Sequence, residues 1–278
     1  MKKYLLCKKE IGSSKKENIL SVKSEEEILN FTFFKDDYLF LSKKNILIRD
    51  NKEFINFLDK KENKEKFFKP VFLFKPQDFL FEERKNTIHV LENGGSNIKS
   101  INLNIGSWVD MNSSEQHRLS NMIKKYNESE LEANFCFSQN IFYISIDKIN
   151  RIFSYKNGEI QTILGDGYPN YSVASDLHKS KINNPKGICA NKNRIYFCDY
   201  GNGIIRSLKK DIRIEGEIYP RNREYKPKLI KLDNKKIYFL SNNKIYNSSQ
   251  TIVHSSENKI ISFGFKDRFL YLLEEENE

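Results

Sequence analysis

The sequence predicts an all-β protein built from four-stranded antiparallel sheets, and three observations lead to this prediction. Apolar runs of about four to seven residues, rich in Phe, Ile, Leu and Tyr, recur along the chain. Turns of about two to four residues, rich in Asn, Asp, Lys and Gly, separate the runs and predict antiparallel hairpins. The runs form groups that recur at about 40–50 residues, which is the period of a β-propeller blade.

Six such groups follow one another along the chain. Five are complete, and they lie near residues 28–58, 69–103, 133–164, 186–215 and 227–255. The sixth, 258–273, provides only two runs, and the N-terminal runs within 2–23 provide the two strands that it lacks. Sharing a sheet between the chain ends leaves no blade incomplete. We therefore predict a single domain over residues 1–278: a six-bladed β-propeller, closed by its N-terminal strands. The alternatives are an irregular β-sandwich and a pair of smaller β domains.

The composition indicates a folded and basic protein. Hydrophobic residues make up 38% of the chain, aromatic residues 13% and charged residues 30%, and the net charge is +10. A positive charge is compatible with nucleic acid, an acidic membrane surface or an acidic protein as partner. Lysines alternate with glutamates in segments such as DKKENKEK (59–66). This mixture is typical of a solvated loop rather than of a dedicated phosphate-binding surface.

The N-terminus and the cysteines favour an intracellular, cytoplasmic protein. The segment MKKYLLCKKEIGSS has only a short apolar stretch, too short for a secretory signal, and no run approaches the roughly 20 apolar residues of a membrane span. We therefore expect neither a signal peptide nor membrane insertion. No two cysteines form a CxxC pair, so we expect free buried thiols in a reducing compartment at the following positions: Cys7, Cys136, Cys189 and Cys198.

Residues 163–208 carry the most specific motif of the chain. A glycine-rich loop is followed by a Pro-Lys-Gly-Ile start of a strand, a second apolar run that ends in Asp, and then Asn and Ile-Arg. This order resembles an NHL repeat, and the specific match covers only this blade, about one sixth of the chain. The resemblance implies a six-bladed propeller. The motif positions, which we interpret as structural, are Gly165, Gly167, Pro185, Gly187, Asp199, Asn202 and Arg206.

The chemistry of these side chains supports a structural interpretation. The carboxylate of Asp199 is expected to accept hydrogen bonds from N–H groups of the turn that follows it. Gly201 and Gly203 are expected to permit positive φ in this turn. Arg206 is expected to pair with Asp199 or with a neighbouring blade.

Enzymes of similar fold define what a catalytic site would require. The resemblance extends to lactone hydrolases, which hold calcium with Glu, Asn and Asp, and to NHL-type peptide-amidating lyases, which bind zinc through histidines. The four histidines here show no metal-ligand spacing. The expected first strands are nearly without carboxylates and imidazoles: FTFF, VFLF, FCF, ICA, IKL and SFGF. We therefore predict no catalytic residue, metal or cofactor, and do not expect a small-molecule substrate.

Two insertions are candidates for binding a partner. In the first, 106–131, Asn112 and Glu115 predict the start of a helix, which either packs over a propeller face with Trp108 as its anchor or docks a partner. The second, 165–184, is an enlarged connection between blades, and such loops often bind partners. The candidate partner-binding residues of the two insertions are Trp108, Leu119, Met122, Ile123, Tyr126, Tyr168, Tyr171 and His178.

The sequence therefore predicts a non-catalytic scaffold that binds another macromolecule, with protein as the expected partner. A subunit of a larger assembly fits the same pattern. The first alternative is a basic NHL-type propeller that binds single-stranded RNA on a face with gathered Arg, Lys and aromatic residues. The second alternative is a calcium-dependent, lactonase-like hydrolase.

Overall fold

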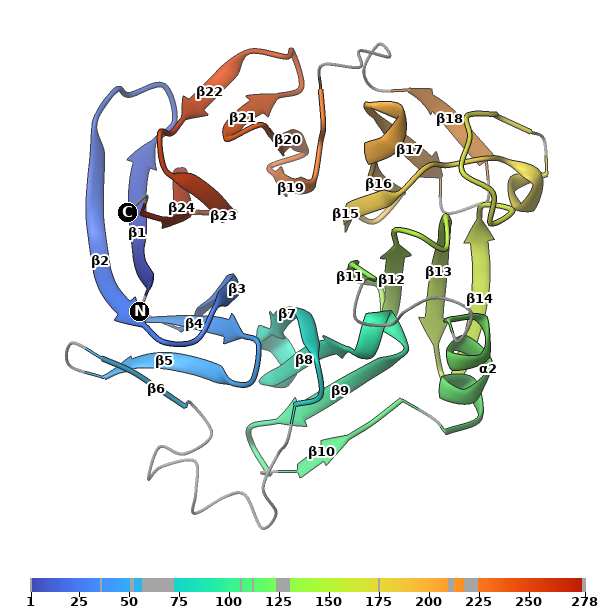
Figure 1. Cartoon of the computed structure of the whole chain (residues 1–278), viewed down its shortest axis with the longest axis horizontal. Coiled ribbons are helices and arrows are strands. Elements are labelled where there is room, and N and C mark those ends of the chain that lie inside the picture. The colour runs from blue at the N-terminus through green and yellow to red at the C-terminus, as the bar shows by residue number, and fades with distance from the viewer. Residues whose placement is uncertain are drawn as a thin grey trace. The chain divides into compact units, whose positions relative to one another are not determined.

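The computed structural model describes residues 2–35, 37–50, 53–56, 73–105, 107–111, 113–123, 131–174, 176–209, 213–217 and 225–276. The chain divides into two compact units. The first comprises Met1–Asn93, Asn97–Met111 and Ser256–Glu278, and the second comprises Gly94–Ser96 and Asn112–Ser255. Within the described residues, each unit contains three four-stranded sheets (Figure 1). All strand pairings within these sheets are antiparallel, as the short turns predict.

The first unit contains the strands of both chain ends. Its sheets have the strand orders β2-β1-β24-β23, β3-β4-β5-β6 and β10-β9-β8-β7. The bounds are β1 Lys2–Glu10, β2 Lys16–Ser24, β23 Lys259–Lys266, β24 Phe269–Glu275, β3 Ile28–Phe34, β4 Asp37–Ser42, β5 Ile46–Asp50, β6 Glu53–Asn56, β7 Pro76–Glu82, β8 Thr87–Glu92, β9 Asn97–Asn102 and β10 Ser107–Val109. Short 3₁₀ turns, η2 Glu83–Lys85 and η3 Asn93–Gly95, follow β7 and β8.

The second unit has the same strand pattern and one helix. Its sheets have the orders β11-β12-β13-β14, β15-β16-β17-β18 and β19-β20-β21-β22. The bounds are α2 Ser113–Ile123, β11 Ala133–Ser138, β12 Ile141–Ile146, β13 Arg151–Lys156, β14 Glu159–Leu164, η5 Leu177–Lys179, β15 Pro185–Ala190, β16 Arg194–Asp199, η6 Tyr200–Asn202, β17 Ile204–Lys209, β18 Arg213–Glu217, β19 Leu229–Asp233, β20 Lys236–Ser241, β21 Lys244–Asn247 and β22 Ile252–Ser255.

The sheet that holds both chain ends pairs β1 with β24. Leu6 lies opposite Leu273, and Cys7 lies opposite Leu272. Figure 1 shows the N and C labels beside this pair of strands. The N-terminal strands and the last two strands, which the sequence leaves as incomplete groups, therefore share one sheet.

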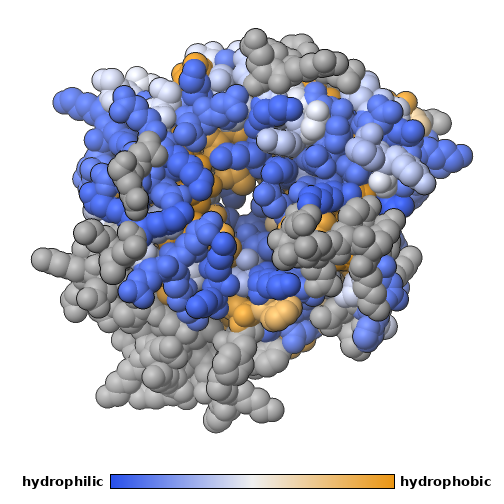
Figure 2. Space-filling model, in the orientation of Figure 1, coloured by the Kyte–Doolittle hydropathy of each residue, from blue (hydrophilic) through white to orange (hydrophobic). Residues whose placement is uncertain are grey.

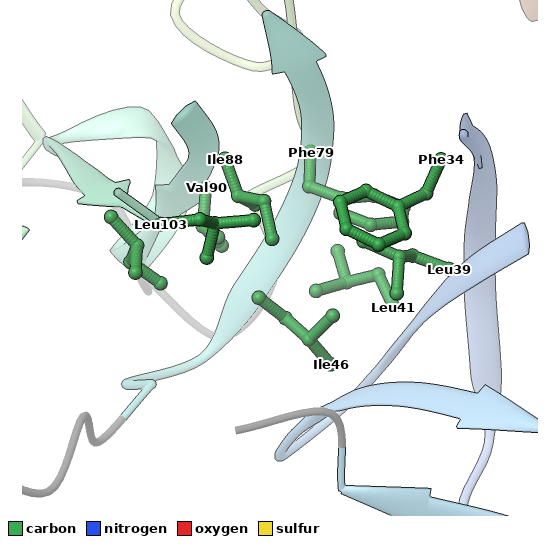
Figure 3. Close-up of a cluster of buried hydrophobic side chains, with 9 residues drawn as sticks. Phe34, Leu39, Leu41, Ile46, Phe79, Ile88, Val90 and Leu103 are labelled. Carbon is green, nitrogen blue, oxygen red and sulfur yellow. The ribbon is translucent and has the colours of Figure 1, made fainter. Parts of the chain in front are cut away.

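Apolar side chains between the β3–β6 and β7–β10 sheets form one core of the first unit. Ile88 and Val90 lie two positions apart on β8, so they point to the same face of the strand, and both are fully buried. They pack with residues of β3, β4, β5, β7 and β9 and with Leu103 (Figure 3). Fully burying one such Leu, Ile or Phe side chain contributes about 1.5–3 kcal/mol. The clustered members are Phe34, Leu39, Leu41, Ile46, Phe79, Ile88, Val90, Ile101 and Leu103.

The strand register of the β7–β10 sheet differs from the sequence prediction. We expected VFLF (71–74) as its first strand, but that strand is β7, in which Phe79 lies opposite Val90. Residues 71–72 lie outside the described part of the chain. The fourth strand is β10, so Trp108, expected within a helical insertion, lies in a strand opposite Ile101. The two apolar runs are adjacent in the chain, and Phe79 of β7 is the buried member of the core while Leu73 is only partly buried against it.

Other expectations concern cysteines and membrane helices. The four cysteines are free, and Cys7, Cys189 and Cys198 are buried, as predicted, whereas Cys136 is only partly buried. Burial raises the pKa of the Cys7 thiol to about 11. None of the helices in the described ranges combines the length and apolar character needed to cross a membrane.

A buried histidine lies on β8 of the first unit. The side chain of His89 places Nδ1 2.8 Å from the Ser100 hydroxyl and Nε2 3.2 Å from a carboxylate oxygen of Glu82. Burial lowers the pKa of His89 below its ordinary value of 6.5, and the nearby Glu82 only partly opposes this effect.

We expect this histidine to make the protein less stable as the pH falls below about 6.5. The unfolded chain takes up a proton in this range while folded His89 stays neutral, so protonation favours unfolding. In urea titrations at about pH 7 and about pH 5.5, His89→Gln should lose less free energy of unfolding on acidification than the wild type. Equal losses in the two proteins would refute the assignment.

Candidate functional site

The enlarged connection 165–184 of the second unit folds back on itself. Ser172 and Lys181 exchange backbone hydrogen bonds of 3.3 Å each, and they form an isolated antiparallel bridge. The hydroxyl of Ser180 accepts a hydrogen bond from the Ala174 N–H at 3.0 Å. The connection is therefore a folded segment with its own pairing.

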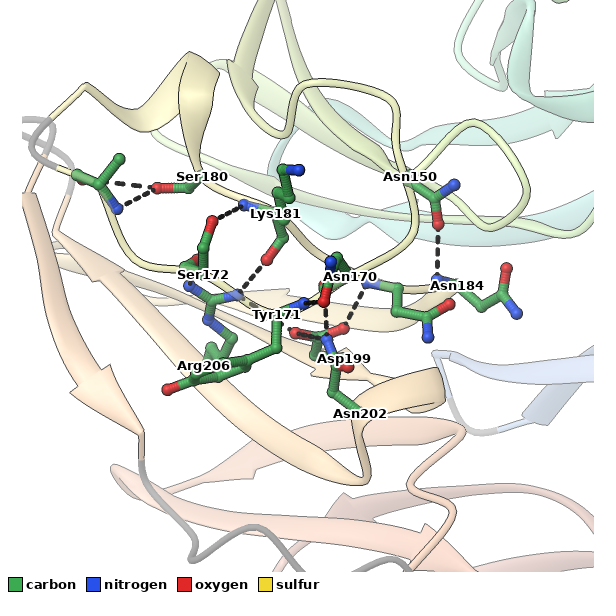
Figure 4. A network of polar contacts seen from close by, with 12 residues as sticks. Asn150, Asn170, Tyr171, Ser172, Ser180, Lys181, Asn184, Asp199, Asn202 and Arg206 are labelled. Carbon is green, nitrogen blue, oxygen red and sulfur yellow. Dashed lines mark hydrogen bonds and ion pairs between the residues drawn. The ribbon is translucent and has the colours of Figure 1, made fainter.

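Arg206 fastens this segment to the sheet beneath it. Its side chain, on β17, is 1% exposed. One guanidinium nitrogen donates to the Lys181 carbonyl at 2.9 Å and to the Asp199 carboxylate at 3.2 Å, and the other donates to the Ser172 carbonyl at 3.2 Å. Figure 4 shows the guanidinium next to Ser172 and Lys181 of the two paired stretches. One fork of donors thus joins both stretches to the end of β16.

Asp199 is the acidic centre of this network. Its carboxylate is fully buried and accepts hydrogen bonds from the Asn183 N–H at 2.7 Å and the Asn202 amide at 2.9 Å. The Asn202 amide also donates to the Asn170 carbonyl at 3.0 Å. Burial has the largest influence on the pKa of Asp199 and raises it, while these hydrogen bonds and Arg206 act in the opposite direction. We call Asp199, Asn202, Arg206 and their partners the Asp199 network.

Two details of this turn differ from the sequence prediction. Asp199 accepts no capping hydrogen bond from the backbone N–H groups of the turn that follows it. Its carboxylate instead bonds the side-chain amide of Asn202 in that turn and the Asn183 N–H of the segment before β15. Gly203 has a positive φ of 69°, but Gly201 is absent from the positive-φ positions of the described chain. Gly201 is required for space instead, since a Cβ there would lie 2.3 Å from the Asn183 side chain.

Glycines at the start of the connection allow a close approach to the β12–β13 turn. Gly165 has φ +102°, and a Cβ on it would lie 2.2 Å from the Asn150 carbonyl oxygen. Gly167 has φ +95° and packs against the guanidinium of Arg151. At the other end of the connection, the Asn184 N–H donates to the Asn150 side chain at 2.8 Å. Both ends are therefore attached to one turn.

A second network of the same design lies in the first unit. The buried carboxylate of Glu92 accepts hydrogen bonds from the Phe74 N–H and the Asn97 amide, both at 3.0 Å, and lies 3.5 Å from the buried Lys99 ammonium. Pro76 lies opposite Glu92 as Pro185 lies opposite Asp199. In both networks the basic residue follows the acidic residue by seven positions in the sequence. In both, the residue whose N–H binds the carboxylate comes two positions before the proline. We call this the Glu92 network.

The connection forms one side of a pocket of about 880 Å³. Four asparagines dominate its lining, together with two basic residues, one carboxylate and an exposed tyrosine. The lining residues are Asn121, Lys148, Ile149, Asn150, Arg151, Asp166, Gly167, Tyr168, Pro169, Asn183 and Asn184. Amide side chains donate and accept hydrogen bonds but carry no titratable proton near neutral pH. Such a lining is suited to holding a polar ligand.

The pocket also carries an exposed aromatic side chain and charged groups. Tyr168 is 70% exposed, and its backbone N–H is fixed by the Asp166 carboxylate at 2.8 Å. Arg151 donates to the Asp166 carbonyl at 3.0 Å, and Lys181 lies 4.0 Å from the Asp166 carboxylate. Figure 2 colours most of the visible described surface as hydrophilic, with small apolar patches between.

The predicted partner-binding residues do not converge on the pocket. Tyr168 lines it, Tyr171 lies with its ring 5.6 Å from the Arg206 guanidinium, and His178 is exposed in η5. Leu119 and Ile123 of α2 are fully buried, which fits packing of this helix. Met122 also lies in α2, Trp108 lies in β10, and Tyr126 lies outside the described residues.

Sequence reasoning missed the polar lining of the pocket. Lys148, Asn150 and Arg151 belong to an ordinary-looking turn, so no local pattern separates them from other turn residues. Asn183 and Asn184 directly precede Pro185 of the NHL-like motif, and that position was their only signal.

The first strand of one sheet, β7, holds a carboxylate, although the sequence predicted almost none in such strands. Asp78 on β7 accepts a hydrogen bond from the Asn30 amide at 2.6 Å, and Asn30 accepts one from Ser262 at 2.5 Å. All three side chains are buried. Asp78 was missed because the first strand was assigned to 71–74. Within the described ranges, no group of three or more His, Cys, Asp or Glu residues is arranged to hold a metal ion.

Comparisons with known proteins bear on the fold. No family model matches the chain, and no curated protein gives a significant match. Solved structures do: streptogramin B lyase is 16% identical with a TM-score of 0.55, covering 89% of this chain and 72% of that one. An inactive virginiamycin B lyase variant from Staphylococcus aureus with quinupristin is 14% identical with a TM-score of 0.56, covering 95% and 86%. A nidogen/laminin complex structure is 10% identical with a TM-score of 0.58, covering 90% and 92%.

These likenesses define the class of protein. The neighbours are β-propeller proteins, and the chain shares their all-β architecture of four-stranded antiparallel sheets. The neighbours include both a lyase and a protein-binding domain, and at identities of 16% or less the likeness describes the fold alone.

Proposed function

We propose that this chain is a six-bladed β-propeller that binds a protein partner at the pocket beside connection 165–184. The proposed blades are the six described sheets, and the sheet shared by the chain ends closes the ring. The observation that carries the binding proposal is the pocket of about 880 Å³, with its amide-rich lining and exposed Tyr168.

The rigidity of the pocket supports this proposal. Binding is weakened when a loop must be ordered on association, and a preformed loop avoids that cost. The buried Asp199 and Arg206 side chains hold the connection at several backbone positions. Tyrosine gives a large contact area with few rotatable bonds, and asparagine gives adaptable hydrogen bonding, so both suit protein recognition.

The comparisons offer precedent for binding by this class of fold. One similar structure is a nidogen/laminin complex, and another contains virginiamycin B lyase with quinupristin. The alternative of single-stranded RNA rests on Lys148 and Arg151 beside Tyr168, because cations and aromatic rings also contact nucleic acid.

Affinity purification of the tagged protein from its native cells, with and without nuclease, tests this proposal. We expect a stoichiometric protein partner that survives nuclease and falls about tenfold in recovery with Tyr168→Ala, because the exposed ring is a main contact. Phe74→Ala, which removes another exposed aromatic ring, is the matched control and should leave recovery unchanged. A partner released by nuclease would favour RNA, and a partner retained by Tyr168→Ala would exclude this pocket.

A further inference from the structure

Two lysines share one aromatic ring in the second unit. The Lys186 ammonium lies 4.6 Å and the Lys226 ammonium 5.4 Å from the centre of the Tyr200 ring. Lys186 also pairs with Glu132 at 2.5 Å. The backbone N–H of Lys226 donates to the Ser241 hydroxyl at 2.7 Å, which fixes the start of this side chain. Two cations at one ring repel each other; Glu132 offsets this repulsion at Lys186, and a further anion near Lys226 would reduce it again.

The ring that both lysines contact belongs to a turn that is hydrogen-bonded to the pocket lining. Tyr200 follows Asp199, whose carboxylate binds the N–H of Asn183, and the Gly201 N–H donates to the Asn183 carbonyl at 2.8 Å. Asn183 and Asn184 line the pocket, and Lys186 is two residues further along the chain. The pocket lining and the ring that both lysines contact are therefore linked through the backbone of Asn183.

We infer that the partner presents an acidic peptide segment, with one carboxylate held by Lys186 and Lys226 and the adjoining backbone held by the pocket amides. This inference rests on the proposed function. The local charges support it: among the pocket lining, the lysine pair and their charged neighbours, five residues are basic and three are acidic, which leaves an excess of positive charge. They are Lys148, Arg151, Lys181, Lys186, Lys226, Glu132, Asp147 and Asp166.

The interspersed acids favour a peptide over a nucleic acid. Glu132 pairs with Lys186, and Asp166 lies near Lys181. A single-stranded nucleic acid carries one charge per nucleotide and would bring phosphates close to these carboxylates. A peptide with one or two acidic residues can place its charges at the lysines and its neutral amides elsewhere.

A random peptide library of about 12 residues, displayed on phage and selected on the purified full chain, supplies the probe. We expect selected peptides to be enriched in Asp or Glu. In fluorescence anisotropy, the labelled peptide should bind about three- to tenfold more weakly to Lys226→Gln, since partly exposed charge pairs have modest effects. Lys192→Gln, an exposed charge in the β15–β16 turn, is the matched control and should bind as the wild type does.

Charge exchange makes the test specific. Lys226→Glu should weaken the acidic peptide further, and a peptide with Lys in place of its acidic residue should recover binding to this variant. Peptides that need Tyr168 but show no acidic preference would overturn the inference and leave the proposed function standing. Tighter binding of a 12-residue oligouridine, or no peptide that depends on Tyr168, would overturn both.

Discussion

Arg206→Met is expected to lower the free energy of unfolding by about 3–5 kcal/mol, because it leaves the buried Asp199 carboxylate without its cation. Asp199 is 0% exposed and Arg206 is 1% exposed. Methionine approximates the length of the arginine stem, so the loss reports the charge and its hydrogen bonds. Urea denaturation followed by circular dichroism measures this change, with exposed Arg84→Met as a control expected to stay within about 0.5 kcal/mol of wild type.

The double variant Asp199→Asn/Arg206→Met separates this pair from general packing. Removing both charges leaves no unpaired carboxylate, so its loss should be smaller than the sum of the two single losses. Hydrogen exchange of the Lys181 and Asn183 N–H groups should accelerate in Arg206→Met. Additive losses with unchanged exchange would contradict the proposed fastening of the connection.

Gly165→Ala is expected to be the second most damaging substitution, with a loss of about 3 kcal/mol or more in the free energy of unfolding. Two causes combine: a backbone at φ +102°, and a Cβ 2.2 Å from the Asn150 carbonyl oxygen. Strained backbone of this kind costs about 1–3 kcal/mol. The clash forces the β12–β13 turn to move, which adds to that cost. Thermal and urea unfolding of the purified variant measure the sum.

Two other glycines separate these causes. Gly12 has φ +92° with no atom within 4 Å of an added Cβ, so Gly12→Ala reports backbone strain alone. Gly187 shows no such positive φ, but its Cβ would lie 2.7 Å from the Leu229 Cα, so Gly187→Ala reports the clash alone. Gly165→Ala should exceed either variant. A loss no larger than that of Gly12→Ala would show that the turn adjusts freely.

Local patterns in the sequence predicted much of this fold because strands and hairpins are local. The apolar strand β8 with its buried Ile88 and Val90 and the short turns follow from such patterns. The choice between 71–74 and β7 did not, since both are apolar. A signal was nevertheless present: Pro76-Gln77-Asp78-Phe79 has the spacing of Pro185-Lys186-Gly187-Ile188.

The candidate site was less predictable, for a physical reason. The partners of Asp199 include the Asn183 N–H, sixteen residues earlier, and hydrogen bonds to backbone leave no side-chain signature at their far end. The pocket amides come from α2, the β12–β13 turn and the C-terminal end of the connection. Tertiary structure alone brings such separate segments together. Tyr168 was therefore the only lining residue that the sequence predicted to bind a partner.

The matching Asp199 and Glu92 networks suggest how such a chain can diversify. In both, a buried carboxylate at the end of the second strand anchors the chain just before the first strand. This anchor point fixes the start of the first strand whatever the length of the incoming loop. The loop between two blades can therefore vary in length, as connection 165–184 does, provided that its own attachments at Gly165 and Arg206 are kept. Loops grafted at this point between anchor and preceding blade should be accepted, which makes the protein a scaffold for recombining binding surfaces.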